Sequence, residues 1–207
     1  MLKRKRKRNP IKQKLAEEIL NEADKYYFLG EGEIGEVYYF IISDNLKIKS
    51  TVLRPGEYIL KVEKYEKLSN KEKGYLRSLS DKRLIPRIYY NDNEIMIQSY
   101  FSGMTLKDFI ILYNKDDFLI FSVLDEIAKK LAKWHSLLIT HGDLNYNNIL
   151  VNVKEIDIQL IDPVADCKLP ISSDIANLKK IFYYYYNIDK YEKYITFFLE
   201  KYNNYLK

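Results

Sequence analysis

The sequence predicts an α+β protein of two lobes, with a small antiparallel sheet in the N-lobe and a reduced, mainly helical C-lobe. Two stretches lead to this prediction. Between residues 28 and 62, glycines punctuate alternating apolar residues such as Leu60 and Val62, which is typical of antiparallel strands. From residue 120 to 138, apolar residues recur at spacings of three and four, which is the strongest helix signal in the chain.

Length and composition limit the organisation of the chain. With 207 residues, 47% of them hydrophobic, it can bury one substantial core or two small lobes, but hardly two independent domains. We divide it into an arm with an N-terminal helix (1–27), an N-lobe (28–102) and a C-lobe (103–207). The single cysteine excludes an internal disulfide, and a reducing, cytoplasmic setting fits. No stretch is apolar enough to span a bilayer, so we expect no membrane-embedded part.

A basic run opens the chain. Lys3 to Arg8 alternate lysine and arginine and carry much of the net charge of +5. The run is too short and too charged to pack, so we expect a solvated arm, with binding of nucleic acid, an acidic partner or an anionic membrane surface as alternatives. The apolar residues from Ile11 to Ala23 then recur every four residues and predict a helix with one apolar stripe.

The remaining elements follow from periodicity and turn residues. They are a turn at 54–56, a helix over 67–80, a buried strand over 95–101, a hairpin over 149–160 and helices between 175 and 202. The strand over 95–101 leads to Gly103, where we place the boundary between the lobes.

The first polar motif lies in the predicted strands. Gly30, Gly32, Gly35 and Val37 match the pattern GxGxxGxV in LGEGEIGEV, where missing side chains let backbone amides approach phosphates. The pattern alone is weak, since a glycine-rich hairpin is often only a hairpin. Two glutamates inside the loop are also unusual neighbours for a phosphate.

A lysine in an apolar strand is the second candidate. Lys61 in YILKVEK can reach the α and β phosphates of a nucleotide if an acidic side chain holds it. Glu72 is the proposed holder, and Glu66 is a substitute. The alternative is an edge-strand lysine without such a role.

The third motif is the most specific. Residues 141–150 read HGDLNYNNIL, and QLIDP with Asp162 follows. Asp143 can accept or orient a hydroxyl proton, while Asn148 and Asp162 offer oxygen ligands for magnesium. The structural alternative is a Gly-Asp turn in an Asx-rich loop. We assign packing roles, not a base role, to His135 and His141.

Together these motifs resemble the eukaryotic-protein-kinase-like superfamily, from Gly30 to about Leu178. HGD in place of HRD, and the short length, are more similar to its atypical branches: RIO kinases, the kinase subunit of the KEOPS complex, and aminoglycoside or fructosamine-type phosphotransferases. The segments EKGYLRSLSDKRLIPRIYYND and IMIQSYFSGMTLKDFI resemble the RIO and KEOPS pattern of helix, strand pair and hinge. The resemblance implies ATP with Mg²⁺, or alternatively Mn²⁺. It also implies that Glu72 pairs with Lys61, that His141 braces the loop backbone, and that Ser99 to Phe101 form the hinge facing adenine.

The chain departs from this family in the segment after Asp162. Pro163 and Val164 stand where Phe-Gly is usual, the stretch before Asp174 is short, and no APE motif is present. We therefore expect neither a flipping phenylalanine nor regulation by loop phosphorylation. Asp174, in SSDIANL, is either the residue that braces the catalytic loop or a simple helix N-cap.

The functional expectation is a minimal atypical serine/threonine kinase that transfers the ATP γ-phosphate to a protein hydroxyl, with a protein substrate or partner complex. Two alternatives remain open. One is a small-molecule kinase of the aminoglycoside or fructosamine type. The other is an ATP-binding or ATPase module in a nucleoprotein assembly.

Overall fold

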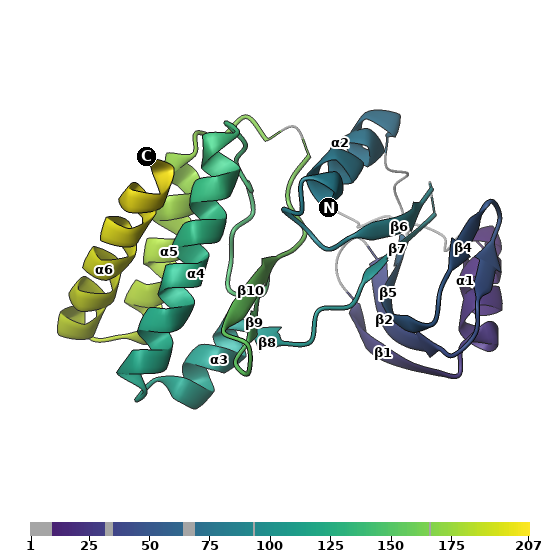
Figure 1. Cartoon of the computed structure of the whole chain (residues 1–207), viewed down its shortest axis with the longest axis horizontal. Helices are drawn as coiled ribbons and strands as arrows, with labels where there is room; N and C mark the ends of the chain where they lie inside the picture. The colour runs from purple at the N-terminus through teal and green to yellow at the C-terminus, as the bar shows by residue number, and fades with distance from the viewer. Residues whose placement is uncertain (1–9, 32–34, 64–68, 93, 166) are drawn as a thin grey trace, which may run out of the picture. The chain divides into compact units, whose positions relative to one another are not determined.

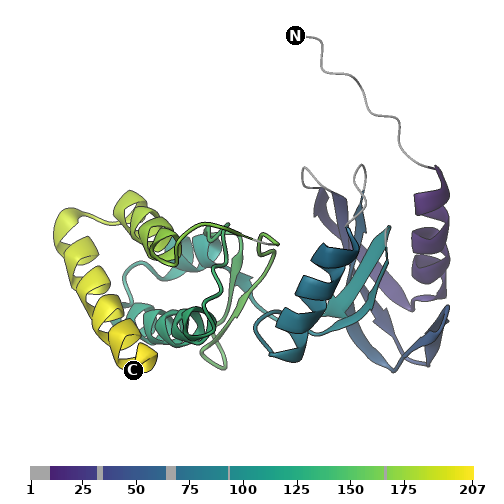
Figure 2. The same cartoon turned by 90° about the horizontal axis from the view of Figure 1, so that it is seen from above.

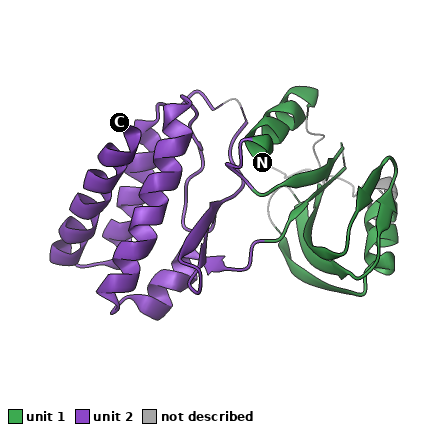
Figure 3. Ribbon diagram, viewed as in Figure 1, with its two compact units in different colours: residues 1–81, 86–100 green, residues 82–85, 101–207 purple. Residues whose placement is uncertain are grey.

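The computed structural model describes residues 10–31, 35–63, 69–92, 94–165 and 167–207. The basic arm, Gly32 and Glu66 lie outside these ranges. The chain divides into two compact units (Figure 3). Unit 1 comprises Met1–Asp81 and Pro86–Tyr100, and unit 2 comprises Lys82–Ile85 and Phe101–Lys207.

Unit 1 is built on a five-stranded antiparallel sheet with the strand order β1-β2-β5-β7-β6 (Figure 1). Its strands are β1 (Lys25–Glu31), β2 (Gly35–Ile42), β5 (Gly56–Glu63), β6 (Ile88–Asn91) and β7 (Ile95–Ser99). A separate hairpin is formed by β3 (Leu46–Ile48) and β4 (Thr51–Leu53), and the turn predicted at 54–56 joins β4 to β5.

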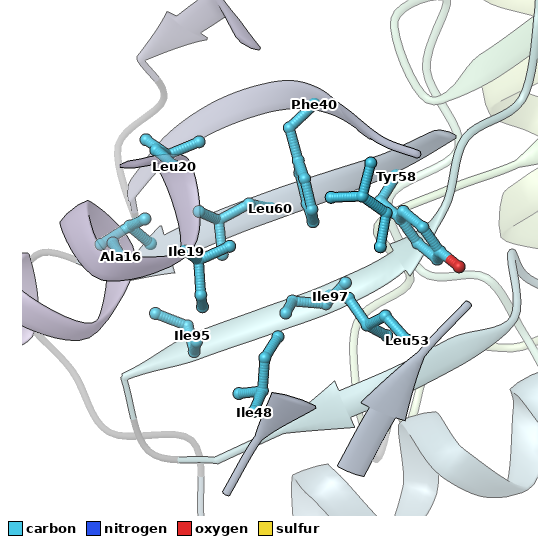
Figure 4. Close-up of a cluster of buried hydrophobic side chains, with 12 residues drawn as sticks. Ala16, Ile19, Leu20, Phe40, Ile48, Leu53, Tyr58, Leu60, Ile95 and Ile97 are labelled. Carbon is cyan, nitrogen blue, oxygen red and sulfur yellow. The ribbon is translucent and has the colours of Figure 1, made fainter. Parts of the chain in front are cut away.

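Two helices, α1 (Pro10–Glu22) and α2 (Asn70–Asp81), lie on opposite sides of this sheet (Figure 2). The helix α1 places Ile19 against Leu60 and Ile97 of the central strands in a buried apolar cluster (Figure 4). Alternate residues of a strand point to opposite faces, so Lys61 lies on the face opposite Leu60. The core on the α1 side therefore leaves the Lys61 face available for other contacts.

Unit 2 combines four helices with a small sheet of order β10-β9-β8. The elements are β8 (Met104–Thr105), α3 (Leu106–Tyr113), α4 (Asp117–Ser136), β9 (Ile149–Asn152), β10 (Asp157–Leu160), α5 (Ser172–Tyr185) and α6 (Ile188–Leu206). The central helix α4 contacts β10 and packs along α6 (Figure 1). In the described residues, no helix combines the length and the apolar character needed to cross a membrane.

The predicted α+β class is confirmed: unit 1 is built on a sheet and unit 2 is mainly helical, which is consistent with a two-lobed kinase-like fold. Some elements differ from the prediction. The helix α3 and strand β8 were not predicted, although Thr105 caps α3 by accepting the Asp108 N–H at 3.1 Å. Ile156, counted in the hairpin alternation, lies in the turn with φ 48° and belongs to neither strand.

Candidate active site

The loop between α4 and β9, in unit 2, carries Asp143 on the surface. Two asparagine amides hold its carboxylate. Asn148 Nδ2 donates to Asp143 Oδ2 at 2.9 Å and to the Asp143 carbonyl at 2.8 Å. Asn145 Nδ2 donates to Asp143 Oδ1 at 3.2 Å. The carboxylate is thus oriented while it stays accessible to solvent.

Asn145 also shapes the loop itself. Its Oδ1 accepts the backbone N–H of Asn147 at 2.9 Å and of Asn148 at 3.3 Å, which is an Asx turn. The Asx-rich loop named as the structural alternative therefore contains an Asx turn. It places the two amides that orient Asp143, so the turn and the candidate site are parts of one structure.

Asn148 and Asp162 are the predicted magnesium ligands. Since the amide nitrogen of Asn148 is bound to Asp143, its Oδ1 is the atom left to bind a cation. The Ile161 N–H donates to the Asn148 carbonyl at 3.0 Å, which brings the chain just before Asp162 beside Asn148. Asp162 is exposed and has φ 55°, a left-handed conformation that is uncommon outside glycine and concentrates at functional sites.

These ligands suit Mg²⁺, or alternatively Mn²⁺, because amide and carboxylate oxygens are donors that both ions accept. No cluster of three or more His, Cys, Asp or Glu side chains occurs among the residues that the structure describes. Mg²⁺ commonly uses one or two protein oxygens together with water and substrate phosphates. One amide oxygen and one carboxylate are therefore a sufficient protein contribution.

Asp174 braces this loop by accepting hydrogen bonds from its backbone. Its Oδ2 accepts the His141 N–H at 2.8 Å and its Oδ1 accepts the Gly142 N–H at 3.1 Å. It lies in the first turn of α5, whose N-cap residue is Ile171, so it is not an N-cap. Of the two roles left open by the sequence, the structure supports the brace.

The Asp174 carboxylate is fully buried, with 0% of its surface exposed. Burial opposes its ionisation, but hydrogen bonds from His135 and from two backbone amides outweigh burial and lower its pKa. The ionised form is the one that accepts all three bonds. The loop backbone is therefore held by a charged, satisfied group.

His141 ties the loop to the segment around Asp162. Its Nε2 lies 2.9 Å from the Ile161 carbonyl, and its own carbonyl accepts the Val164 N–H at 2.9 Å. Burial lowers the pKa of the His141 imidazole. These bonds fit the bracing role that the resemblance implies for His141.

The surroundings of Gly142 explain why glycine stands in HGD where other kinases have the arginine of HRD. The residue has φ 83°, and a Cβ there would come within 2.6 Å of Cys167 Sγ and 3.1 Å of Val164 Cβ. The arginine of an HRD motif would have to displace both side chains. Close packing against the segment after β10 thus requires glycine.

Two participants, Asn145 and Tyr202, were not predicted from the sequence, and His135 was predicted only to be a packing residue. His135 joins Asp174 to Tyr202 of α6 through its two ring nitrogens. The motif HGDLNYNN contains Asn145, so its turn could have been inferred from the Asx preference for turns. Tyr202 had no signal beyond its place in the helical periodicity.

In unit 1, strand register aligns several of the predicted nucleotide-binding residues. Gly30 of β1 is the partner of Val37 of β2, and Val37 is the partner of Lys61 of β5. Partners in an antiparallel sheet point to the same face, so Val37 and Lys61 are neighbours. This is the face opposite the α1 core.

The two described glycines of the loop differ. A Cβ on Gly35 would overlap the Val62 carbonyl oxygen, so close strand packing alone requires this glycine. A Cβ on Gly30 would meet nothing within 4 Å. Gly32 lies outside the described residues. The nucleotide role of the loop remains a prediction.

Glu72 has a structural role at the start of α2. Its Oε2 accepts the Ser69 N–H at 2.7 Å, and its own N–H donates to Ser69 Oγ at 3.2 Å. This is a capping box. The pairing of Glu72 with Lys61 stays a prediction, and the substitute, Glu66, lies outside the described residues.

The predicted hinge begins at the end of β7. The N–H of Ser99 donates to the Arg87 carbonyl at 2.8 Å, and its Oγ accepts the Arg87 N–H at 3.0 Å. Phe101 is half-buried and is the first residue of its segment in unit 2. The backbone N–H and the hydroxyl of Ser99 thus both bond to the backbone of Arg87. Adenine binding by Ser99 and Phe101 remains a prediction.

Comparison with known proteins gives a similarity to a protein described as a kinase. The chain is 29% identical over 178 residues to a protein of Dictyostelium discoideum described as a probable serine/threonine-protein kinase, mkcE. The match covers 80% of this chain and 24% of that protein, so the chain spans about a quarter of its relative's length. No family model matches the chain. The similarity supports a relationship to protein kinases in general.

Proposed function

We propose that the chain is an ATP-dependent phosphotransferase, in the form of a minimal atypical serine/threonine kinase that acts on a protein hydroxyl. The observation that carries the proposal is the oriented carboxylate of Asp143. Two asparagine amides hold it, and buried Asp174 fixes the backbone beside it. Similarity to a probable serine/threonine kinase supports the same activity.

Each group has a defined task in this proposal. Asp143 accepts the hydroxyl proton of the substrate and orients its oxygen toward the γ-phosphorus of ATP. The new P–O bond forms as the bond from the γ-phosphorus to the β–γ bridging oxygen breaks, and ADP leaves. Asn148, through Oδ1, and Asp162 would hold Mg²⁺. When bound, Mg²⁺ neutralises charge on the phosphate oxygens. Lys61 provides a cation for the nucleotide phosphates.

The test is transfer of label from γ-labelled ATP with Mg²⁺ to the protein itself and to generic basic proteins. Asp189→Asn is the matched control for Asp143→Asn, because Asp189 is an exposed aspartate in the first turn of α6. We expect labelled serine or threonine with the native protein and the control, and little with Asp143→Asn. Label transfer that Asp143→Asn leaves unchanged would refute the assignment.

A small-molecule acceptor is the second candidate. The segment between Asp162 and Asp174 is short, which leaves little chain for a peptide-docking surface. A panel of aminoglycosides and fructosamine-type compounds, incubated with the same labelled ATP, separates the two acceptor classes. Label found only on a compound of the panel selects the small-molecule class, and phosphate release without any labelled acceptor selects an ATPase module.

A further inference from the structure

The last helix of the chain, α6, reaches the catalytic loop through Tyr202. We propose that Tyr202 is a positioning residue: its hydroxyl fixes His135, and His135 and Asp174 together fix the loop backbone beside Asp143. The catalytic part of this inference rests on the proposed function, whereas the structural part does not.

The connection is a continuous chain of buried hydrogen bonds. The hydroxyl of Tyr202 lies 2.7 Å from His135 Nδ1, and His135 Nε2 lies 3.1 Å from Asp174 Oδ2. The same oxygen accepts the His141 N–H at 2.8 Å. Exposed fractions are 6% for Tyr202, 1% for His135 and 0% for Asp174. Water therefore has little access to any of these bonds.

The negative charge of Asp174 determines which atom donates in each of these hydrogen bonds. Asp174 accepts hydrogen bonds as a carboxylate, so His135 must present its proton on Nε2. In the neutral imidazole with its proton on Nε2, Nδ1 is an acceptor and the Tyr202 O–H is its donor. Removing the hydroxyl would leave a buried ring nitrogen without a partner and would free the imidazole to reorient.

Aromatic packing holds the Tyr202 ring independently of its hydroxyl. The ring stacks on Phe198 with centroids 5.9 Å apart and meets the His135 ring edge-on at 5.6 Å. Tyr202→Phe keeps both ring contacts and deletes one oxygen atom. The substitution therefore tests the hydrogen bond rather than the packing of α6.

Tyr205 provides the matched control on the same helix. Its hydroxyl donates to the Asp125 carboxylate of α4 at 3.1 and 3.2 Å, so it too joins α6 to α4 by one tyrosine hydrogen bond. Tyr205 is 43% exposed, and its hydroxyl bonds to Asp125 rather than to His135 or Asp174. Tyr205→Phe thus reproduces the loss of an α4–α6 bond without disturbing Asp174.

The direct test is backbone hydrogen exchange of the His141 and Gly142 amides, followed by NMR. Both amides donate to Asp174. Tyr202→Phe should speed their exchange about tenfold, the effect of losing one buried hydrogen bond, and Tyr205→Phe should leave it unchanged. Equal exchange rates at these amides in both variants would overturn the proposal.

Two further measurements keep the inference separate from the proposed function. If the chain transfers phosphate, Tyr202→Phe should lower kcat about fivefold to tenfold with KM for ATP unchanged, and Tyr205→Phe should alter neither. If no transfer is found for the native protein, the exchange result still decides the structural claim. Should Tyr202→Phe fail to fold, ¹⁵N shifts of the native His135 ring decide it, since a proton on Nδ1 alone would contradict the chain of bonds.

Discussion

The two units present their candidate residues in different ways. In unit 2, side chains distant in sequence form hydrogen bonds with one another. His135 and Tyr202 are 67 positions apart, and His135 Nδ1 lies 2.7 Å from the Tyr202 hydroxyl oxygen. In unit 1, backbone register places the candidates, and the row of Gly30, Val37 and Lys61 follows from strand pairing. The geometry of the candidate catalytic loop thus depends on tertiary partners, whereas the candidate nucleotide-binding face is built largely by a regular sheet.

The largest expected effect is that of replacing Lys61, the candidate phosphate-binding residue of unit 1. If the Lys61 row binds nucleotide phosphates, Lys61→Ala should lower kcat/KM for ATP roughly a hundredfold, because a cation on the phosphates is lost. Lys47→Ala is the control, since Lys47 is an exposed strand lysine of the small β3–β4 hairpin. Steady-state kinetics with both variants measures the effect. Similar activity in the two variants would remove Lys61 from the site.

The brace of unit 2 gives the next effect. Asp174→Ala leaves the His141 and Gly142 amides buried without their acceptor and should lower the free energy of unfolding by about 3 kcal/mol. Urea denaturation measures it.

The same residue gives a pH dependence. The pKa of Asp174 is lowered in the folded state, so its contribution is present above the unfolded value of about 4 and is lost as pH falls through the lower, folded pKa. The acid-induced loss of stability should be smaller in Asp174→Ala than in the native protein. An identical acid profile for the two proteins would show that Asp174 carries no such stabilisation.

Two glycines, one from each unit, should respond oppositely to alanine. Gly142→Ala should destabilise by about 2 kcal/mol, because φ 83° disfavours a side chain and the new Cβ would meet Cys167. Gly74→Ala, in α2 with open space around the new Cβ, should stabilise by about 1 kcal/mol. Thermal unfolding of both variants provides the comparison, and equal shifts of the same sign would contradict it.

The smallest effect separates two roles of Glu72. Glu72→Ala should lower the free energy of unfolding by about 1 kcal/mol through loss of the capping box. Glu72→Gln keeps a side chain that can form the capping box and should leave this free energy unchanged. Ser78→Ala, on the exposed surface of α2, controls for helix propensity. If Glu72 also pairs with Lys61, Glu72→Gln should lower kcat/KM at unchanged stability. Unchanged kinetics in Glu72→Gln would limit the residue to its cap.

Much of the fold follows from local pattern. Periods of two and of three to four residues predicted the sheet of unit 1, the long helix α4 and the C-terminal helices, because each pattern depends on burial of one face. The short helix α3 was missed, although the Thr105 cap and Asp108 mark its start. Ile156 was misplaced because the alternation continued into a turn.

The site was predictable only in part. Asp143, Asn148 and Asp162 belong to a short motif and could be named from the sequence. The brace of Asp174 could be stated only as one of two roles, since its partners lie 32 and 33 positions away. Tyr202 could not be inferred, because a tyrosine on an apolar helix face has the same pattern whether or not its hydroxyl meets a histidine.

The central claim is that the loop around Asp143 performs phosphoryl transfer. The most direct test is the initial rate of γ-phosphate transfer by the native protein, Asp143→Asn and Asp189→Asn at saturating Mg²⁺ and ATP, with the folding of each checked by circular dichroism. We predict that Asp143→Asn is slower by at least about a hundredfold while Asp189→Asn matches the native rate. A folded Asp143→Asn variant that transfers phosphate at the native rate would contradict the account.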